Sequence, residues 1–261
     1  MSERLSRRHL IKVAGVAGAA GLTGPALAQP AERQTPGMGE PPVAARPGLP
    51  PEIGAELHHQ PAAPLYFFFT EPEAAFVRAA ADRLIPPDEQ WPGAGDAGVV
   101  EYIDRQLAGA YGNGAGIYLD GPWQQGTPEQ GYQLRYTPAE LYRVAIAAIN
   151  RHLADELDGR GLPDLEPEEQ DQALERMESG EIQIEELPVQ VFFETLLANT
   201  IEGFFADPAY GGNRDMVGWR MVGFPGAYGQ YAFEVEQHGM IWDHPPVSMA
   251  DTVHSRHHGH D

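Results

Sequence analysis

Apolar residues recur at three- and four-residue spacing in five stretches of the chain, which is the period of an amphipathic helix. In the first stretch, Thr70 and Glu73 are placed to form a capping box, and Pro86-Pro87 marks the end. We therefore expect a helix from Thr70 to about Ile85. Its apolar face consists of Phe76, Val77, Ala80, Ala81 and Leu84.

The same signals predict four further helices. The second covers Asp96 to Ala110, and the third opens with Thr137-Pro138-Ala139-Glu140, where a proline at the first helical position lies inside a second capping box. The fourth covers Glu166 to Ser179. The fifth covers Pro188 to Ala206, and its dense phenylalanines and leucines place it at the centre of the core.

No stretch of the sequence shows a convincing alternation of apolar and polar residues, which is the signal of a half-buried strand. We therefore predict an all-α fold with one compact helical domain over residues 65–250. Long loops are expected over residues 112–136 and after Asp207, where glycine, tyrosine and tryptophan are frequent.

The first 28 residues have the features of an export signal. Ser6-Arg7-Arg8-His9-Leu10-Ile11-Lys12 is the twin-arginine pattern, and a Gly/Ala-rich run follows it as far as Ala26-Leu27-Ala28. That run is too short and too weakly apolar for a permanent membrane anchor. We expect the twin-arginine translocase to read Arg7 and Arg8, cleavage between Ala28 and Gln29, and a periplasmic destination. This route carries folded cargo, which typically means that a cofactor is loaded before export.

Two further segments flank the helical domain. Residues 29–64 hold nine prolines and few large apolar side chains, so they cannot bury enough surface to offset their ordering entropy. We interpret them as a Pro-rich extended arm, which is either a plain linker or a pre-extended segment that lies along a partner. Residues 251–261 form a His-rich tail, which either binds a transition metal weakly or is a solvated chain end.

Charge and cysteine content exclude several kinds of function for this chain. Without residues 1–28, the chain has 13 basic and 37 acidic residues, so its net charge is 13 − 37 = −24. This charge argues against nucleic-acid binding and against docking on anionic lipid. The absence of cysteine excludes disulfides, thiolate iron–sulfur clusters and C-x-x-C-H haem attachment. We predict no catalytic, cofactor or metal site on this chain, and we expect a partner protein to bear the cofactor.

A set of motifs spread over residues 66–250 is distinctive: Phe68-Phe69-Thr70, Asp82-Arg83-Leu84-Ile85-Pro86, 92–99, 102–107, 202–208, 210–215, Gly218-Trp219 and 223–226. Together these motifs resemble subunit 3, the gamma or small subunit, of gluconate 2-dehydrogenase. The resemblance implies a non-catalytic small subunit that accompanies a large subunit of the glucose-methanol-choline type, and often a multihaem cytochrome c subunit. FAD would then be on the large subunit and haem c on the cytochrome. Because FAD is inserted in the cytoplasm, one export signal would serve two chains.

The segment Asp207–Gly226 is the strongest candidate for the partner interface. It combines aromatic anchors with hydrogen-bonding groups between glycines, a composition typical of interface cores; the candidate residues are Tyr210, Asn213, Arg214, Trp219 and Phe224. In an equally weighted alternative, Trp219 and Phe224 fold inward and close the helical core. The nearby carboxylates of Glu202, Asp207 and Asp215 are expected to be caps, solvated groups or arginine partners.

Two other function classes stay open from the sequence. One is an enzyme with an unrecognised site, and the other is an independent exported protein that binds a ligand or a metal.

Overall fold

The computed structural model describes residues 65–123, 127, 134–185, 187–228, 239 and 244–250, and the export signal, the arm and the His-rich tail lie outside this range. The described residues contain no strand, which confirms the all-α class. The helices are α2 (Glu71–Leu84), α3 (Val99–Ala108), α4 (Pro138–Glu156), α5 (Pro167–Glu178), α6 (Val189–Phe205) and α7 (Val217–Val222), with short 3-10 helices η2 (Leu162–Asp164), η3 (Pro208–Tyr210) and η4 (Arg214–Met216).

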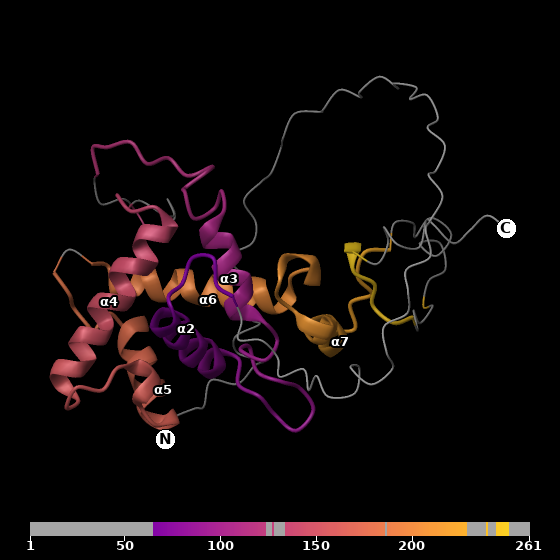
Figure 1. The fold of residues 1–261 in the computed structure, drawn as a ribbon, viewed down its shortest axis with the longest axis horizontal. Coiled ribbons are helices and arrows are strands. Elements are labelled where there is room, and N and C mark those ends of the chain that lie inside the picture. Colours follow the sequence, from indigo (N-terminus) through magenta and orange to yellow (C-terminus); the bar gives the residue numbers. More distant parts are fainter. Residues whose placement is uncertain are drawn as a thin grey trace, which may run out of the picture. The chain divides into compact units, whose positions relative to one another are not determined.

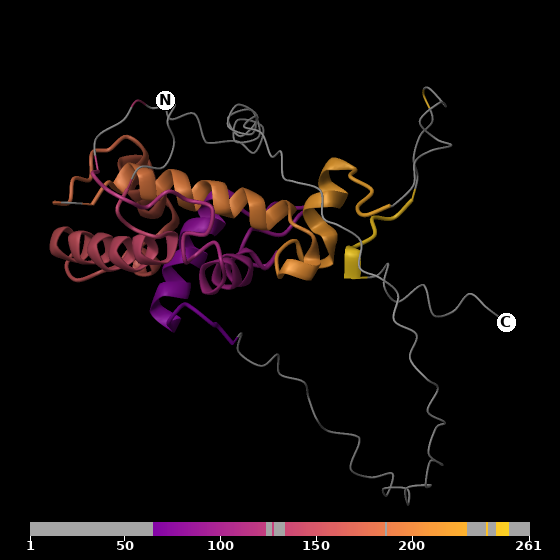
Figure 2. The same cartoon turned by 90° about the horizontal axis from the view of Figure 1, so that it is seen from above.

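Helix α6 is the central element of the domain, as its apolar composition predicted. It packs against α2, α3, α4, α5 and α7, and Figures 1 and 2 show it running from α4 at one end to α7 at the other. Phe192 of α6 is fully buried and lies 5.3 Å from the ring of Tyr142 and 6.3 Å from that of Phe76, measured between ring centroids. Three helices therefore meet at one aromatic cluster.

Local signals in the sequence fix where α2 and α4 begin. The backbone N–H of Thr70 donates to Glu73 Oε2 at 2.8 Å, and that of Thr137 donates to Glu140 Oε2 at 2.8 Å. Both predicted capping boxes are therefore present. Their hydrogen bonds satisfy amide groups that a helix start leaves without intrahelical partners.

The structure differs from the predicted helices in two places. Helix α3 begins at Val99 and not at Asp96, because Gly98 has φ 84°, in the left-handed region, and cannot continue a helix from residues 96 and 97. After residue 206, where only loops were expected, the chain forms η3, η4 and the six-residue helix α7. The first difference arises where Gly98 approaches Gly211, and the second lies within the segment 207–226.

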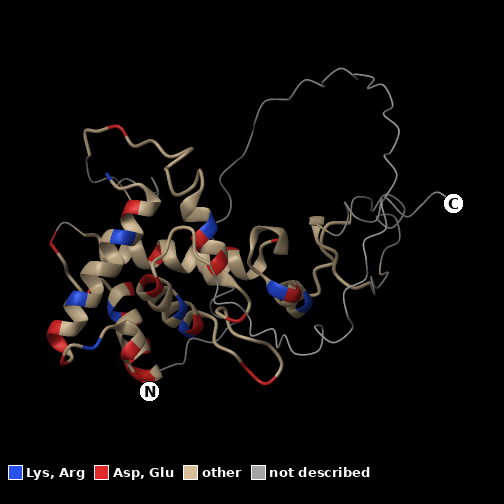
Figure 3. Ribbon diagram, in the orientation of Figure 1, with Lys and Arg blue, Asp and Glu red and all other residues tan. Residues whose placement is uncertain are grey.

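The described surface is rich in carboxylates, especially along α5 and at the C-terminal end of α4 (Figure 3). Arginines pair with some of them: Arg83 with Asp171 at 2.7 Å, Arg160 with Glu169 at 2.7 Å and Arg176 with Glu156 at 2.9 Å. Exposed ion pairs contribute only about 0–1 kcal/mol each. A large acidic excess remains unpaired with arginine, and this net charge makes copies of the chain repel one another.

Candidate functional site

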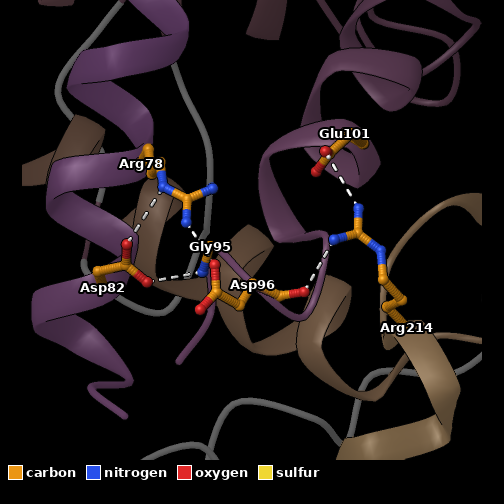
Figure 4. A network of polar contacts seen from close by, with 6 residues as sticks. All are labelled: Arg78, Asp82, Gly95, Asp96, Glu101 and Arg214. Carbon is orange, nitrogen blue, oxygen red and sulfur yellow. Dashed lines mark hydrogen bonds and ion pairs between the residues drawn. The ribbon is translucent and has the colours of Figure 1, made fainter. Parts of the chain in front are cut away.

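The loop of residues 92–98 is held on one side by helix α2. The backbone N–H of Gly95 donates to Asp82 Oδ1 at 2.7 Å, and Arg78 Nη2 donates to Asp96 Oδ1 at 2.5 Å (Figure 4). Arg78 Nε also lies 3.6 Å from Asp82 Oδ2. Burial raises the pKa of Asp82, although the Gly95 hydrogen bond and the Arg78 charge act in the opposite direction.

On its other side, the same loop is held by Arg214. The backbone N–H of Arg214 donates to the Ala97 carbonyl at 2.8 Å, and Nη1 donates to the Asp96 carbonyl at 3.0 Å. Nη2 reaches Glu101 Oε1 on α3 at 3.2 Å (Figure 4). One guanidinium thus joins the segment 207–226 to both the loop and α3.

Two glycine positions show how closely these segments pack. A Cβ on Gly98 would stand 2.8 Å from the Gly211 carbonyl oxygen, and a Cβ on Gly212 would stand 2.1 Å from the Gly203 carbonyl oxygen. Real Cβ atoms do not approach backbone oxygen this closely. The glycines are therefore required because backbone packs directly on backbone here.

Asn213 organises the turn that leads into α7. Its side chain is fully buried, with Nδ2 donating to the Ala206 carbonyl at 2.9 Å and Oδ1 accepting from the Gly218 N–H at 2.7 Å. Asn213, Asp215 and Met216 all have φ values between 46° and 56°, in the left-handed region. Such conformations are costly for non-glycine residues and persist only where the surrounding structure fixes them.

Trp219 closes the core at the end of α6. The side chain is 6% exposed, and Nε1 donates to the Phe205 carbonyl at 2.7 Å. Phe224 packs edge-to-face on the Trp219 ring, with 5.2 Å between centroids, yet it remains 47% exposed. Tyr210 is also exposed. The segment therefore has an inner side formed by Trp219 and an outer side that presents Phe224 and Tyr210.

Asp207 ties the C-terminal end of the described chain to the end of α6. Its carboxylate accepts from the Ala209 N–H at 2.9 Å, the Ser248 hydroxyl at 2.7 Å and the Met249 N–H at 2.8 Å. Burial by itself would raise the pKa of Asp207, but these hydrogen bonds outweigh it and lower the pKa.

Comparison of the sequence with models of known protein families identifies the family of this chain. The family model described as gluconate 2-dehydrogenase subunit 3 matches residues 71–226, which is more than half of the 261-residue chain. The chain belongs to this family. No curated protein and no solved structure matches it. The family match confirms the resemblance predicted from the motifs, and the name "subunit 3" denotes one part of a multi-subunit dehydrogenase.

In this subunit 3 chain, the five candidate interface residues divide into two groups. Tyr210, Arg214 and Phe224 are exposed, and an interface role for them stays a prediction. Asn213 and Trp219 are buried in the chain's own fold, and for Trp219 this is the inward arrangement that the sequence left open. Arg7, Arg8, Ala28 and Gln29 lie outside the described residues.

The carboxylates near α6 of the subunit 3 chain do not converge on a metal site. Within the described ranges, no group of three or more His, Cys, Asp or Glu side chains could hold a metal ion. Asp207 caps η3, in agreement with the expected role as a cap.

The buried side-chain amide of Asn199 on α6 also has hydrogen-bond partners. Asn199 Nδ2 donates to the Tyr142 hydroxyl at 3.0 Å and to the Tyr111 hydroxyl at 3.3 Å.

Asp104 on α3 is a site residue that the sequence analysis missed. Its carboxylate is buried and accepts three consecutive backbone N–H groups: Oδ2 from Phe67 at 2.7 Å, and Oδ1 from Phe68 at 2.9 Å and from Phe69 at 2.8 Å. It therefore fixes the point where the described domain begins. The available signal was its place on the apolar face of α3, between Ile103 and Leu107.

Within the described part of this subunit 3 chain, no helix has both the length and the apolar character needed to cross a bilayer.

Proposed function

We propose that this chain is the non-catalytic small subunit of an exported FAD-dependent dehydrogenase that oxidises a sugar, a polyol or gluconate. In this proposal the chain carries the flavoprotein large subunit, of the glucose-methanol-choline type, through twin-arginine export and stabilises it in the periplasm. A multihaem cytochrome c subunit is a further partner. The family match over residues 71–226 carries the proposal, because the family is named for one subunit of a dehydrogenase.

The N-terminal sequence supports the export half of this function. Arg7 and Arg8 stand in the twin-arginine pattern, and that route exports folded cargo. A flavoprotein receives FAD in the cytoplasm, so it has to leave the cytoplasm folded. Bound to this chain, a large subunit without its own signal would be exported with its cofactor in place.

Replacing the arginine pair tests this shared export. We expect the double variant Arg7→Lys with Arg8→Lys to leave both the small subunit and the flavoprotein in the cytoplasm, because the receptor reads the arginine pair. The measurement is dye-linked dehydrogenase activity in periplasmic and cytoplasmic fractions. Arg4→Lys, in the same leader but outside the pair, is the matched control. Full periplasmic activity in the double variant would contradict shared export.

Purifying the small subunit alone tests the assignment of chemistry to the partner. We expect the isolated mature chain to show neither flavin nor haem absorbance and no dye-linked oxidation of sugars, because its sequence offers neither a cysteine for haem attachment nor a dinucleotide fingerprint. The co-purified complex serves as the positive control. Stoichiometric FAD on the isolated chain, together with turnover, would instead make this chain an enzyme.

A further inference from the structure

Two large apolar side chains are exposed to solvent at the start of the described domain. Leu65 is 90% exposed and Phe67 is 74% exposed, whereas Phe69, two residues further on, is buried. Single exposed apolar residues are ordinary on a protein surface. A pair of this size at the start of the domain, in which Phe67 is fixed through its backbone N–H, calls for a physical explanation.

The residues from Phe67 to Phe69 are fixed by contacts with two helices. The buried Asp104 carboxylate of α3 accepts the N–H groups of residues 67, 68 and 69, as described above. From α4, Arg143 donates to the Phe68 carbonyl, and its guanidinium carbon lies 4.1 Å from the centroid of the Phe68 ring. Ordering this segment before a partner arrives reduces the entropy lost on binding, which is the advantage of a preorganised contact.

Helix α3 links this segment to the candidate interface of residues 207–226. Glu101, which pairs with Arg214, precedes Asp104 by three residues, so the two carboxylates lie about one helical turn apart on neighbouring positions of one face. The start of the domain and the segment that presents Tyr210 and Phe224 are thus supported by adjacent turns of the same helix.

We propose that Leu65 and Phe67 dock on the flavoprotein large subunit, with Phe67 held in place by Asp104. This inference rests on the proposed function. The occupant follows from where the arm ends: residues 29–64 join the domain directly at Leu65, and a segment of 36 residues can span at most about 110 Å. A partner that receives this arm also covers its end. The net charge of −24 on the mature chain opposes a second copy of this chain as the occupant.

The test uses the full chain expressed together with the flavoprotein that accompanies it. The double variant Leu65→Ser with Phe67→Ser is compared with Tyr118→Ser, which alters a 78% exposed aromatic side chain in the connection between α3 and α4. The flavin recovered per small subunit is measured after purification through the small subunit. We expect the double variant to recover about tenfold less flavin and the control to match the unaltered chain. The melting temperature of the isolated double variant should be unchanged, because both side chains are exposed.

Three results would overturn the inference. Undiminished flavin recovery by the double variant would show that the pair does not contact the large subunit. A large fall in the melting temperature of the isolated variant would make the pair part of the fold. A dimer of the unaltered chain that the double substitution dissolves would assign the surface to a second copy. If the unaltered chain recovers no flavoprotein, the proposed function itself fails, and this outcome is distinct from the other three.

Discussion

Trp219→Ala is expected to lower the free energy of unfolding by about 4 kcal/mol, the cost of removing a buried tryptophan and leaving a cavity. The substitution also removes the hydrogen bond to the Phe205 carbonyl and the ring on which Phe224 packs. For a domain of this size, the melting temperature should fall by about 8–16 °C. Thermal and urea unfolding of the isolated mature chain measure both quantities.

Two controls separate the role of Trp219 in the core from a general effect of losing an aromatic side chain. Trp219→Phe keeps most of the apolar volume and loses the Nε1 hydrogen bond, so it should cost about 1–2 kcal/mol. Trp123→Ala removes a tryptophan that is exposed, and it should change stability by about 0.5 kcal/mol or less. Unchanged melting of Trp219→Ala together with loss of flavoprotein binding would contradict the core role and make Trp219 an interface anchor.

Asp104→Ala is expected to cost about 3 kcal/mol of folding stability, because three backbone N–H groups lose their acceptor and that of Phe69 is buried. The melting temperature should then fall by about 6–12 °C. Asp104→Asn is the more conservative change. It keeps one acceptor oxygen, but an NH2 group replaces the other oxygen and faces a backbone N–H group. We therefore expect Asp104→Asn to lower the folding stability by less than Asp104→Ala does.

Glu175→Ala is the matched control for Asp104, because it removes an exposed carboxylate from a helix surface. Its expected effect is about 0.5 kcal/mol or less. If Asp104→Ala were no more destabilising than Glu175→Ala, water would be satisfying the three amides, and the start of the domain would not depend on this carboxylate.

The five long helices were predictable because their signals are local. Apolar residues three and four positions apart mark one face of a helix, and Thr70 with Glu73 or Thr137 with Glu140 marks its start without reference to the rest of the chain. The start of α3 was not predictable in this way. The left-handed conformation of Gly98 goes together with a close approach to Gly211, which is 113 residues away in the sequence.

The candidate site was predictable only in part, because local sequence signals do not show how its side chains are packed. The composition of residues 207–226 pointed to a distinctive segment, but composition does not tell which side chains face inward. The composition predicts Asn213 as a hydrogen-bonding residue of the partner interface, whereas in the structure the carbonyl of Ala206 and the N–H of Gly218 satisfy it in the interior. Its position between glycines was a usable hint, since asparagine tolerates the left-handed turn conformation found here.

Asp207 also decides how short a working recombinant fragment of this protein can be. The family-matched region stops at residue 226, yet two of the three donors to the Asp207 carboxylate come from Ser248 and Met249. A fragment cut at the family boundary would leave a largely buried carboxylate with one of its three donors. Such a fragment would carry every matched residue and still lack part of the physical unit that folds, so expression boundaries should be set at the hydrogen bonds and not at the limits of sequence similarity.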